Sequence, residues 1–350
     1  MISELRRSVV IPFLLAAVMA ATLPAVACRA SHPASVDATA AAQSAAQKPD
    51  PRPEDFDPTP STPPAIKLSG EKAFATLKEF VALGPRYLGS PGHAKAERFI
   101  LAHLEGAQAE QDQFNVQTAA GPFAMNNIIA KFPGKKDGII VLAGHYDTNL
   151  PLKDTTFIGA NDGGSDVGLL LEIASQLRQQ LKPPTICAGI CPPQLEGYSV
   201  WLVFTDGEEA TIEWTDADSV YGAKHLAQRW KHDGTAQRVK AFLLLDMIGD
   251  RDLHFEHEAN STPWLYEVVR RAGARLHQES HFSDRYGAIS DDHMPFRDAG
   301  IPVVDLIDLD YGFNNLYHHT TQDTPDKCSA QSLQVTADVV AETLRALNTR

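Results

Sequence analysis

Apolar residues recur along this chain with two different spacings. In several segments they lie three or four positions apart, which is the period of an amphipathic helix, and short runs of consecutive apolar residues separate those segments. The helical spacing predicts helices from a cap at Ser69 to Gly84 and over residues 91–104, 167–177, 220–230, 264–276 and 333–344. The apolar runs predict strands over residues 127–132, 139–143, 200–205, 239–245 and 301–307.

The order of these elements favours one fold class. Strands that alternate with helices are typical of an α/β protein, and an apolar run such as 200–205 is typical of a strand covered by helices on both faces. We therefore expect a three-layer α/β/α sandwich with a mixed, mainly parallel central sheet over residues 66–350. Trp201 and Trp230 are expected in its core, and His254 and His257 on a polar strand face.

The first 65 residues lack this pattern. Arg6 and Arg7 precede an apolar run over 9–21, and the small residues 25–27 form a cleavage site, so residues 1–27 are predicted to be a signal peptide. Cys28 follows that site directly, as in a bacterial lipoprotein, although soluble export after cleavage at the same bond fits almost as well. Residues 28–65 contain eight prolines and few large apolar residues, which predicts a disordered tether.

Charge and cysteine content narrow the choice of partners. The formal net charge of −13 argues against a nucleic-acid partner, because no basic face dominates. Membrane contact is expected only through a lipid on Cys28. Cys187 and Cys191 lie in a Pro-rich loop where an exported protein could form a disulfide, and they have no second pair of ligands nearby that would make a zinc knuckle.

Candidate chemistry follows the predicted strands. Acidic residues or histidines stand just beyond strand ends or before a helix: His145 and Asp147, Asp162, Glu208 and Glu209, Asp246, and His318 and His319 in the last long loop. Each of these residues alone has an ordinary structural explanation, such as a helix cap, a turn or a solvated surface. Together they lie where open α/β sheets carry their sites, and histidine with carboxylate but without thiolate is typical of a catalytic zinc site.

Longer stretches of the chain resemble a known family. Residues 206–210, Trp214, 218–222 and 225–227 are similar to the corresponding part of the glutaminyl cyclases, and so are residues 86–92, 245–249 and 291–296. The resemblance spans roughly residues 70–345. The wider superfamily is the zinc aminopeptidases of the aminopeptidase S type, which share the fold and the order of these acidic residues and histidines.

The resemblance implies roles for particular residues. By position, Asp162, Glu209 and His319 resemble the three ligands of the single zinc of the cyclases, and Glu208 resembles their general acid and base. Asp246 and Asp291 resemble the acidic residues of their hydrogen-bond network. Trp214 resembles an aromatic wall of their substrate pocket, and His318, beside the last ligand, is expected to contact the substrate.

The aminopeptidases imply a different metal count. In that family His145 and Asp246 would hold a second zinc with Asp162 as the bridge, and Asp147 would orient His145. We therefore expect an exported, monomeric enzyme that acts on the N-termini of peptides or proteins. With one zinc it would convert N-terminal glutamine to pyroglutamate and release ammonia, whereas with two zincs it would be an aminopeptidase.

Three departures from the animal cyclases put the fit of the substrate in question. His318 stands where those enzymes have Trp, Asp305 stands where a His is expected, and the cysteines that flank their first motif are missing. His293, which follows two acidic residues, is expected to be structural or to support a ligand rather than to bind metal itself.

Overall fold

The computed structural model describes residues 50–181 and 193–350. The predicted signal peptide, Cys28 and the first part of the predicted tether lie outside these ranges. Cys187 and Cys191 lie outside them as well, so the expected disulfide stays a prediction. Within the described ranges Cys328 is a buried free cysteine, and no helix there is long and apolar enough to span a membrane.

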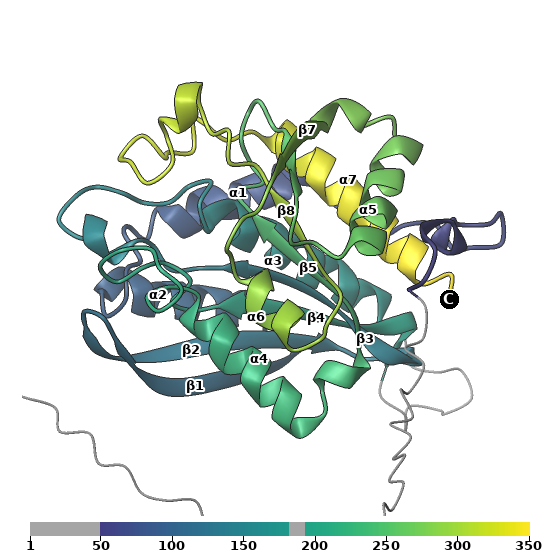
Figure 1. Ribbon diagram of the computed structural model, residues 1–350, viewed down its shortest axis with the longest axis horizontal. Helices are drawn as coiled ribbons and strands as arrows, with labels where there is room; N and C mark the ends of the chain where they lie inside the picture. Colours follow the sequence, from purple (N-terminus) through teal and green to yellow (C-terminus); the bar gives the residue numbers. More distant parts are fainter. Residues whose placement is uncertain (1–49, 182–192) are drawn as a thin grey trace, which may run out of the picture. The chain divides into compact units, whose positions relative to one another are not determined.

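A six-stranded sheet forms the centre of the described chain (Figure 1). In spatial order its strands are β1 (Gln108–Thr118), β2 (Gly121–Phe132), β4 (Leu195–Thr205), β3 (Gly134–His145), β5 (Val239–Asp246) and β8 (Val303–Ile307). The last four run parallel to one another, whereas β2 pairs antiparallel with both β1 and β4. The predicted mixed, mainly parallel sheet is confirmed.

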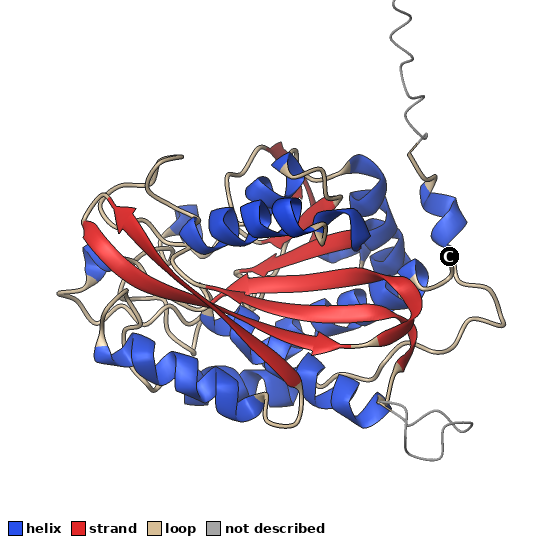
Figure 2. Cartoon of the chain, turned by 90° about the horizontal axis from the view of Figure 1, so that it is seen from below, coloured by secondary structure: helices blue, strands red, loops and turns tan. Residues whose placement is uncertain are grey.

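Helices cover both faces of this sheet (Figure 2). One face carries α1 (Gly70–Val81), α2 (Pro91–His103), α3 (Gly164–Gln180), α5 (Pro263–Arg275) and α7 (Ala330–Leu347), and the other carries α4 (Tyr221–Asp233) and α6 (His293–Asp298). Short 3-10 helices lie at Pro53–Phe56, Leu150–Leu152, Ala236–Arg238, Glu279–His281 and Phe313–Asn315. The predicted helices are therefore present, with ends that differ by a few residues.

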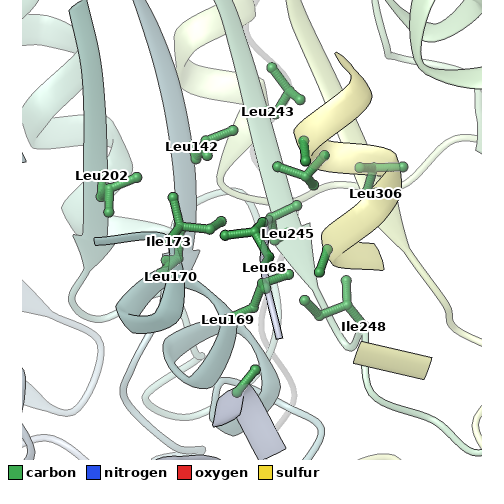
Figure 3. Close-up of a cluster of buried hydrophobic side chains, with 14 of the residues drawn as sticks. Leu68, Leu142, Leu169, Leu170, Ile173, Leu202, Leu243, Leu245, Ile248 and Leu306 are labelled. Atoms are coloured by element: carbon green, nitrogen blue, oxygen red, sulfur yellow. The ribbon is translucent and has the colours of Figure 1, made fainter. Parts of the chain in front are cut away.

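Alternation along each strand builds a separate core on each face. Leu142 and Leu202 pack with the α1–α3–α7 side, whereas their neighbours Val141 and Val203 pack with the α4–α6 side. Figure 3 shows the first of these cores, where leucines of β3 and β4 meet Ile173 of α3. Each fully buried leucine contributes about 2 kcal/mol through the hydrophobic effect. The two cores fix the strands in the positions that the site requires.

Local capping explains where two of the helices begin. The Ser69 side chain accepts the backbone N–H of Lys72 at the start of α1, as predicted. Ser90 accepts the N–H of His93 at the start of α2, and Pro91 occupies the first helical position. These caps satisfy backbone N–H groups at the N-terminal ends of α1 and α2 and so fix where both helices begin.

The structure adds strands that apolar runs did not predict. β1 is an edge strand whose side chains are mostly exposed, and β2 begins six residues before its apolar part. A second, two-stranded sheet pairs β6 (Phe255–Glu258) with β7 (Phe282–Gly287). His257 lies in β6 and stacks on Tyr266, whereas His254 is exposed and precedes the strand, so the expected polar strand face is wrong for His254. Trp230 is buried as expected, whereas Trp201 is only half-buried.

The predicted boundary of the tether at residue 65 is wrong for its described part. One compact unit extends from Asp50 to Arg350. Phe56 is buried and its ring stacks on Trp264 at 5.3 Å, and Asp57 forms ion pairs with Arg271 and Arg275 of α5. The composition of this segment hid the docking, because a few contacts carry it: one aromatic ring, that of Phe56, and the ion pairs of Asp57 and of Asp55, which binds Arg350.

Candidate active site

The carboxyl ends of β3, β4, β5 and β8 meet at one edge of the sheet. Around that edge lies a pocket of about 350 Å³. The predicted residues that line it are Asp162, Glu208, Trp214, Asp246, Asp291, His318 and His319. Met247, Ile289, Ile307 and Leu309 supply apolar walls. The structure therefore brings together side chains that are up to 157 positions apart along the chain (Asp162 to His319).

Two of the three predicted metal ligands converge on the third, His319. Its Nε2 lies 3.1 Å from Glu209 Oε2 and 3.4 Å from Asp162 Oδ2. Asn149 Nδ2 donates a hydrogen bond to the same Glu209 oxygen at 2.9 Å, which fixes the direction of that carboxylate. His319 has a φ of 52°, a backbone conformation that a non-glycine residue rarely adopts.

These donors fit a divalent cation. Asp162 Oδ2 and Glu209 Oε1 are buried and have no hydrogen-bond partner among the described residues. Burial lowers the pKa of His319, but the charges of Glu209 and Asp162 overcome this and raise it to about 11. The carboxylates thus hold a proton on the ring where a metal would replace it. Two carboxylates and one imidazole match a catalytic zinc site with an open position.

A second group of donors lies beside the first. His145 Nε2 is 3.0 Å from Asp162 Oδ1 and 3.5 Å from Asp246 Oδ1, and neither ring nitrogen makes a hydrogen bond within the described chain. Asp166, at the start of α3, completes a buried group with His145 and Asp246 whose donor atoms lie within 4.8 Å of one another. The residues expected to hold a second metal are therefore in place as well.

Glu208 occupies a position that suits proton transfer. It is buried in the pocket wall, and burial raises its pKa well above the usual range, with the nearby charge of Asp291 acting in the same direction and that of His145 opposing it. A carboxyl group with a raised pKa can both accept and release a proton near neutral pH.

Asp147 holds the backbone of the two glutamates. Its carboxylate accepts the N–H of Glu208 at 3.1 Å and the N–H of Glu209 at 3.3 Å. Its distance to His145 Nδ1 is 3.7 Å, so the contact with the histidine, for which it was predicted, is the weaker one. Asp147 therefore orients the glutamates more directly than it orients His145.

Asp291 and Asp305 are two further buried carboxyl groups near Glu208. Burial raises the pKa of Asp291 well above its usual range, and the charge of Asp305 contributes in the same direction. Asp305 lies 3.4 Å from His293 Nδ1, and the other ring nitrogen of His293 is 3.4 Å from Glu258. His293 is fully buried, and neither of its ring nitrogens makes a hydrogen bond within the described chain. With Asp291 and Asp305 it forms a further group of possible metal ligands, so its expected structural or supporting role stays a prediction.

The indole of Trp214 is 39% exposed at the mouth of the pocket. Its loop is fixed by Asp218, whose carboxylate accepts the backbone N–H groups of Thr211, Ile212 and Glu213. Trp214 therefore lines the pocket, its position depends on Asp218 rather than on burial of the side chain, and its role as an aromatic wall stays a prediction.

Sequence reasoning gave no role to several residues that shape the site. Asp323 accepts the backbone N–H of Asn161 at 2.8 Å and that of Asp162 at 3.2 Å. Arg86 is fully buried and donates to the backbone carbonyls of Tyr146 and Gly159, the loop that carries Asp162. Arg86 stands in the stretch 86–92 that resembles the cyclases, whereas Asp323 stands in the same long loop as His318 and His319, outside the resembling stretches.

The fold and the donor set together define a protein of the zinc aminopeptidase-like class. A comparison with family models matches residues 127–344 to peptidase family M28. The match covers more than half of the chain, and the chain therefore belongs to peptidase family M28.

Individual relatives sharpen this assignment. A glutaminyl-peptide cyclotransferase-like protein of Bos taurus is 32% identical over 243 residues, which are 63% of this chain and 61% of that protein, less than two thirds of its length. A glutaminyl-peptide cyclotransferase of Drosophila melanogaster is 29% identical over 75% of both chains. The crystal structure of an Acidobacteriales bacterium glutaminyl cyclase is 45% identical, with a TM-score of 0.76 over 83% of this chain and 99% of that one. The predicted resemblance to glutaminyl cyclases is confirmed.

Proposed function

We propose that this chain is an exported, zinc-dependent glutaminyl-peptide cyclotransferase, which converts the N-terminal glutamine of peptides to pyroglutamate and releases ammonia. The observation that carries the proposal is the position of Glu208. Its buried carboxyl group faces a pocket that has metal donors, apolar walls and the Trp214 indole at its mouth. The similarity to solved glutaminyl cyclases supports the same reaction.

The pocket residues divide the work of the reaction. Asp162, Glu209 and His319 would hold the zinc ion, which when bound supplies a Lewis acid for the carbonyl of the substrate's side-chain amide. Glu208 accepts a proton from the α-amine as the amine nitrogen bonds to the amide carbon. Glu208 then gives that proton to the leaving nitrogen as the carbon–nitrogen bond breaks and ammonia departs. Such proton transfer contributes about 10²–10⁴-fold to rate.

Acidic and apolar neighbours control the substrate. Asp246 and Asp291 border the pocket and can accept hydrogen bonds from the amine, which directs it toward the amide carbon. Ile289, Ile307 and Leu309 exclude water from the amide carbonyl, where water would give glutamate instead of pyroglutamate.

The geometry also supports a second candidate, a two-zinc aminopeptidase. His145 lies near Asp162 and Asp246 with both ring nitrogens free of hydrogen bonds within the described chain, as a second metal site requires. In that enzyme Glu208 would activate a water for peptide hydrolysis rather than move a proton between two amines.

One experiment separates the two candidates. The protein is incubated with a Gln-initiated peptide and, separately, with a Leu-initiated peptide of otherwise identical sequence, and the products are measured as ammonia and free amino acid. We expect ammonia from the first peptide, no leucine from the second, and one zinc per chain. Leucine release with two zincs per chain, and no ammonia, would establish the aminopeptidase instead.

Export belongs to the same proposal. The basic and apolar leader before Cys28 supports it, and acylated protein would fractionate with membranes. Cys28→Ser should then move the protein to the soluble fraction, whereas unmodified wild-type protein in the soluble fraction would leave export without a lipid.

A further inference from the structure

The loop that carries His318 contains a chain of side-chain hydrogen bonds. The backbone N–H of Tyr311 donates to Asn315 Oδ1 at 3.2 Å. The Asn315 amide nitrogen, Nδ2, lies 3.2 Å from His318 Nδ1. A backbone N–H can only donate, so the Asn315 atom that faces Tyr311 must be the amide oxygen. The Asn315 atom that faces His318 is then the nitrogen of the NH₂ group.

This order of donors determines the state of the imidazole. An NH₂ group has no acceptor, so His318 Nδ1 must accept the hydrogen bond and carries no proton itself. The proton of the neutral ring is then on Nε2. With its one lone pair occupied by Asn315, the ring has no free lone pair for a metal, although one of its nitrogens lies within 4.8 Å of donor atoms of Asp162 and His319.

The loop is attached to the metal-binding segment, so this arrangement is held in place. The Tyr311 hydroxyl donates to Asp323 Oδ1 at 2.7 Å, and Asp323 also accepts the backbone N–H groups of Asn161 and Asp162. Asn315 itself has a φ of 59°, and asparagine tolerates this left-handed conformation better than most residues. The position of Asn315 relative to the pocket is therefore set by Asp323 and by its own backbone.

We propose that Asn315 is a positioning residue that makes His318 a hydrogen-bond donor to a carbonyl oxygen of the substrate, rather than a metal ligand. The proposal rests on the proposed function, because it assigns a part of the substrate in that pocket. His318 lines the pocket beside Asp162 and His319, and its Nε2–H is the ring group that Asn315 leaves available. Two carbonyl oxygens qualify, that of the side-chain amide and that of the first peptide bond.

The chain offers a matched pair of variants. Asn314 has a φ of 54°, is exposed, and makes no side-chain hydrogen bond within the described residues, so Asn314→Gly changes a left-handed position without touching His318. Asn315→Gly keeps the left-handed backbone and removes the amide, because glycine adopts this conformation freely. Asn315→Asp keeps the shape and replaces the donor by an acceptor.

The first measurement is independent of activity. In zinc-loaded protein with ¹⁵N-labelled histidine, the His318 signals are identified by their loss in His318→Phe. We expect a protonated Nε2 and an unprotonated Nδ1 in the wild type and in Asn314→Gly, and loss of this signature in Asn315→Asp. A wild-type ring with its proton on Nδ1 would overturn the proposal, even if the protein had no cyclase activity.

The second measurement is a double-mutant cycle on kcat/KM for a Gln-initiated peptide. Loss of one neutral hydrogen bond should lower kcat/KM about fivefold to tenfold in both Asn315→Gly and His318→Phe, with zinc content unchanged. In the His318→Phe background Asn315→Gly should cost nothing further, because its effect passes through the ring. Equal activity of Asn315→Gly and Asn314→Gly, or additive effects, would overturn the proposal.

A substrate analogue assigns the carbonyl. The analogue is a peptide with a methylene group in place of the first peptide carbonyl. If Nε2–H binds that oxygen, the wild type should turn the analogue over about as slowly as His318→Phe turns over the normal peptide. His318→Phe itself should then have the same rate with the analogue as with the normal peptide. If His318→Phe slows both peptides equally, Nε2–H binds the side-chain amide. If it slows neither, the histidine donates to no substrate carbonyl and the proposal fails.

Discussion

Two buried histidine–carboxylate groups lie near the carboxyl ends of β3 and β4, and they differ in whether their polar atoms are hydrogen-bonded. In the first, His93 Nε2 bonds Asp206 Oδ1 at 2.7 Å, and the other Asp206 oxygen accepts the N–H of Asn126. In the second, His145 stands among Asp162, Asp166 and Asp246 at 3.0–3.8 Å, without a hydrogen bond from either ring nitrogen within the described chain.

The difference shows which group needs a ligand. Buried polar atoms are nearly always satisfied in native proteins, so buried atoms without a partner indicate where a ligand could bind. The His93–Asp206 pair joins the start of α2 to the end of β4 and is complete in itself. The His145 group and the adjacent His319 group have unpaired buried oxygens, which a cation would satisfy. The same residue types are thus satisfied by protein alone at His93 and left open to a ligand at His145 and His319.

We call the His145 and His319 groups, with their unpaired oxygens, the incomplete side, and the His93–Asp206 pair the complete side. Removal of metal should have the largest effect, and only on the incomplete side. A chelator should abolish ammonia release from a Gln-initiated peptide, and added zinc should restore it. Without the ion, the side chains of Asp162, Glu209 and His319 offer no Lewis acid to the amide carbonyl. The melting temperature should fall as well, since a bound ion stabilises the folded state. His319→Ala should already have low zinc content and respond little to chelator. Full activity in metal-free protein would end the assignment of this site.

The two glutamates should separate the roles within the incomplete side. Glu208→Gln should retain zinc and lose about 10²–10⁴-fold in kcat, because the amide cannot carry the proton. Glu209→Gln, its matched neighbour, should lose zinc, since it weakens a ligand beside His319. Zinc content by metal analysis and kcat are the two measurements. Zinc loss in Glu208→Gln would mean that the two roles are reversed.

Substitution of His93, on the complete side, should lower stability and leave metal binding unchanged. His93→Gln leaves Asp206 buried without its charged partner and should lower the free energy of unfolding by about 3–5 kcal/mol, with zinc content unchanged. His225→Gln is the control, because His225 pairs with Asp112 at 3.3 Å in a half-exposed position and should cost about 1 kcal/mol or less. Denaturant unfolding measures both variants, and similar losses would contradict the comparison.

The same pair predicts a pH dependence. Burial lowers the pKa of His93, but Asp206 overcomes this and raises it from 6.5 to about 9. Because the folded pKa lies above the unfolded one, the pair contributes fully below about pH 6.5, and its contribution is lost as the pH rises through about 9. Unfolding curves from pH 6 to pH 10 should show this loss in the wild type and lack it in His93→Gln.

The contrast between these groups also marks what the sequence could predict. Apolar periodicity predicted the strands of the parallel part because they are buried on both faces, and strand ends predicted His145, Asp162, Glu208, Glu209 and Asp246 because reactive groups of such sheets lie there. β1 escaped prediction because an edge strand with exposed side chains has no apolar run. The docking of Phe56 escaped because one aromatic residue does not change the composition of a segment.

Completion of hydrogen bonds could not be predicted at all. His93 lies in a predicted helix and His145 at a strand end, but nothing in the sequence shows that Asp206 satisfies His93. That pairing also involves Asn126, 80 positions from Asp206, whose N–H the second Asp206 oxygen accepts. Asp166 and Asn149 likewise join the site only through contacts that the fold creates. Chemistry-bearing residues can therefore be found from pattern, whereas the residues that satisfy or expose them require the structure.

The smallest expected effect is that of Trp214→Ala, which tests whether Trp214 belongs to the incomplete side. Trp214 is 39% exposed and its loop is held by Asp218, so it belongs to neither histidine group. Trp214→Ala should therefore keep zinc and stability, and should lower kcat/KM about tenfold, which corresponds to about 1.4 kcal/mol and is less than the loss of a fully buried aromatic residue. Because the indole helps to exclude water from the amide carbonyl, part of the product should become N-terminal glutamate, which mass spectrometry separates from pyroglutamate. Ile212→Ala, in the same loop and 60% exposed, is the matched control and should change neither rate nor product. Loss of zinc or of stability in Trp214→Ala would show that the wall and the metal site are one unit, and an unchanged rate would remove Trp214 from the substrate pocket.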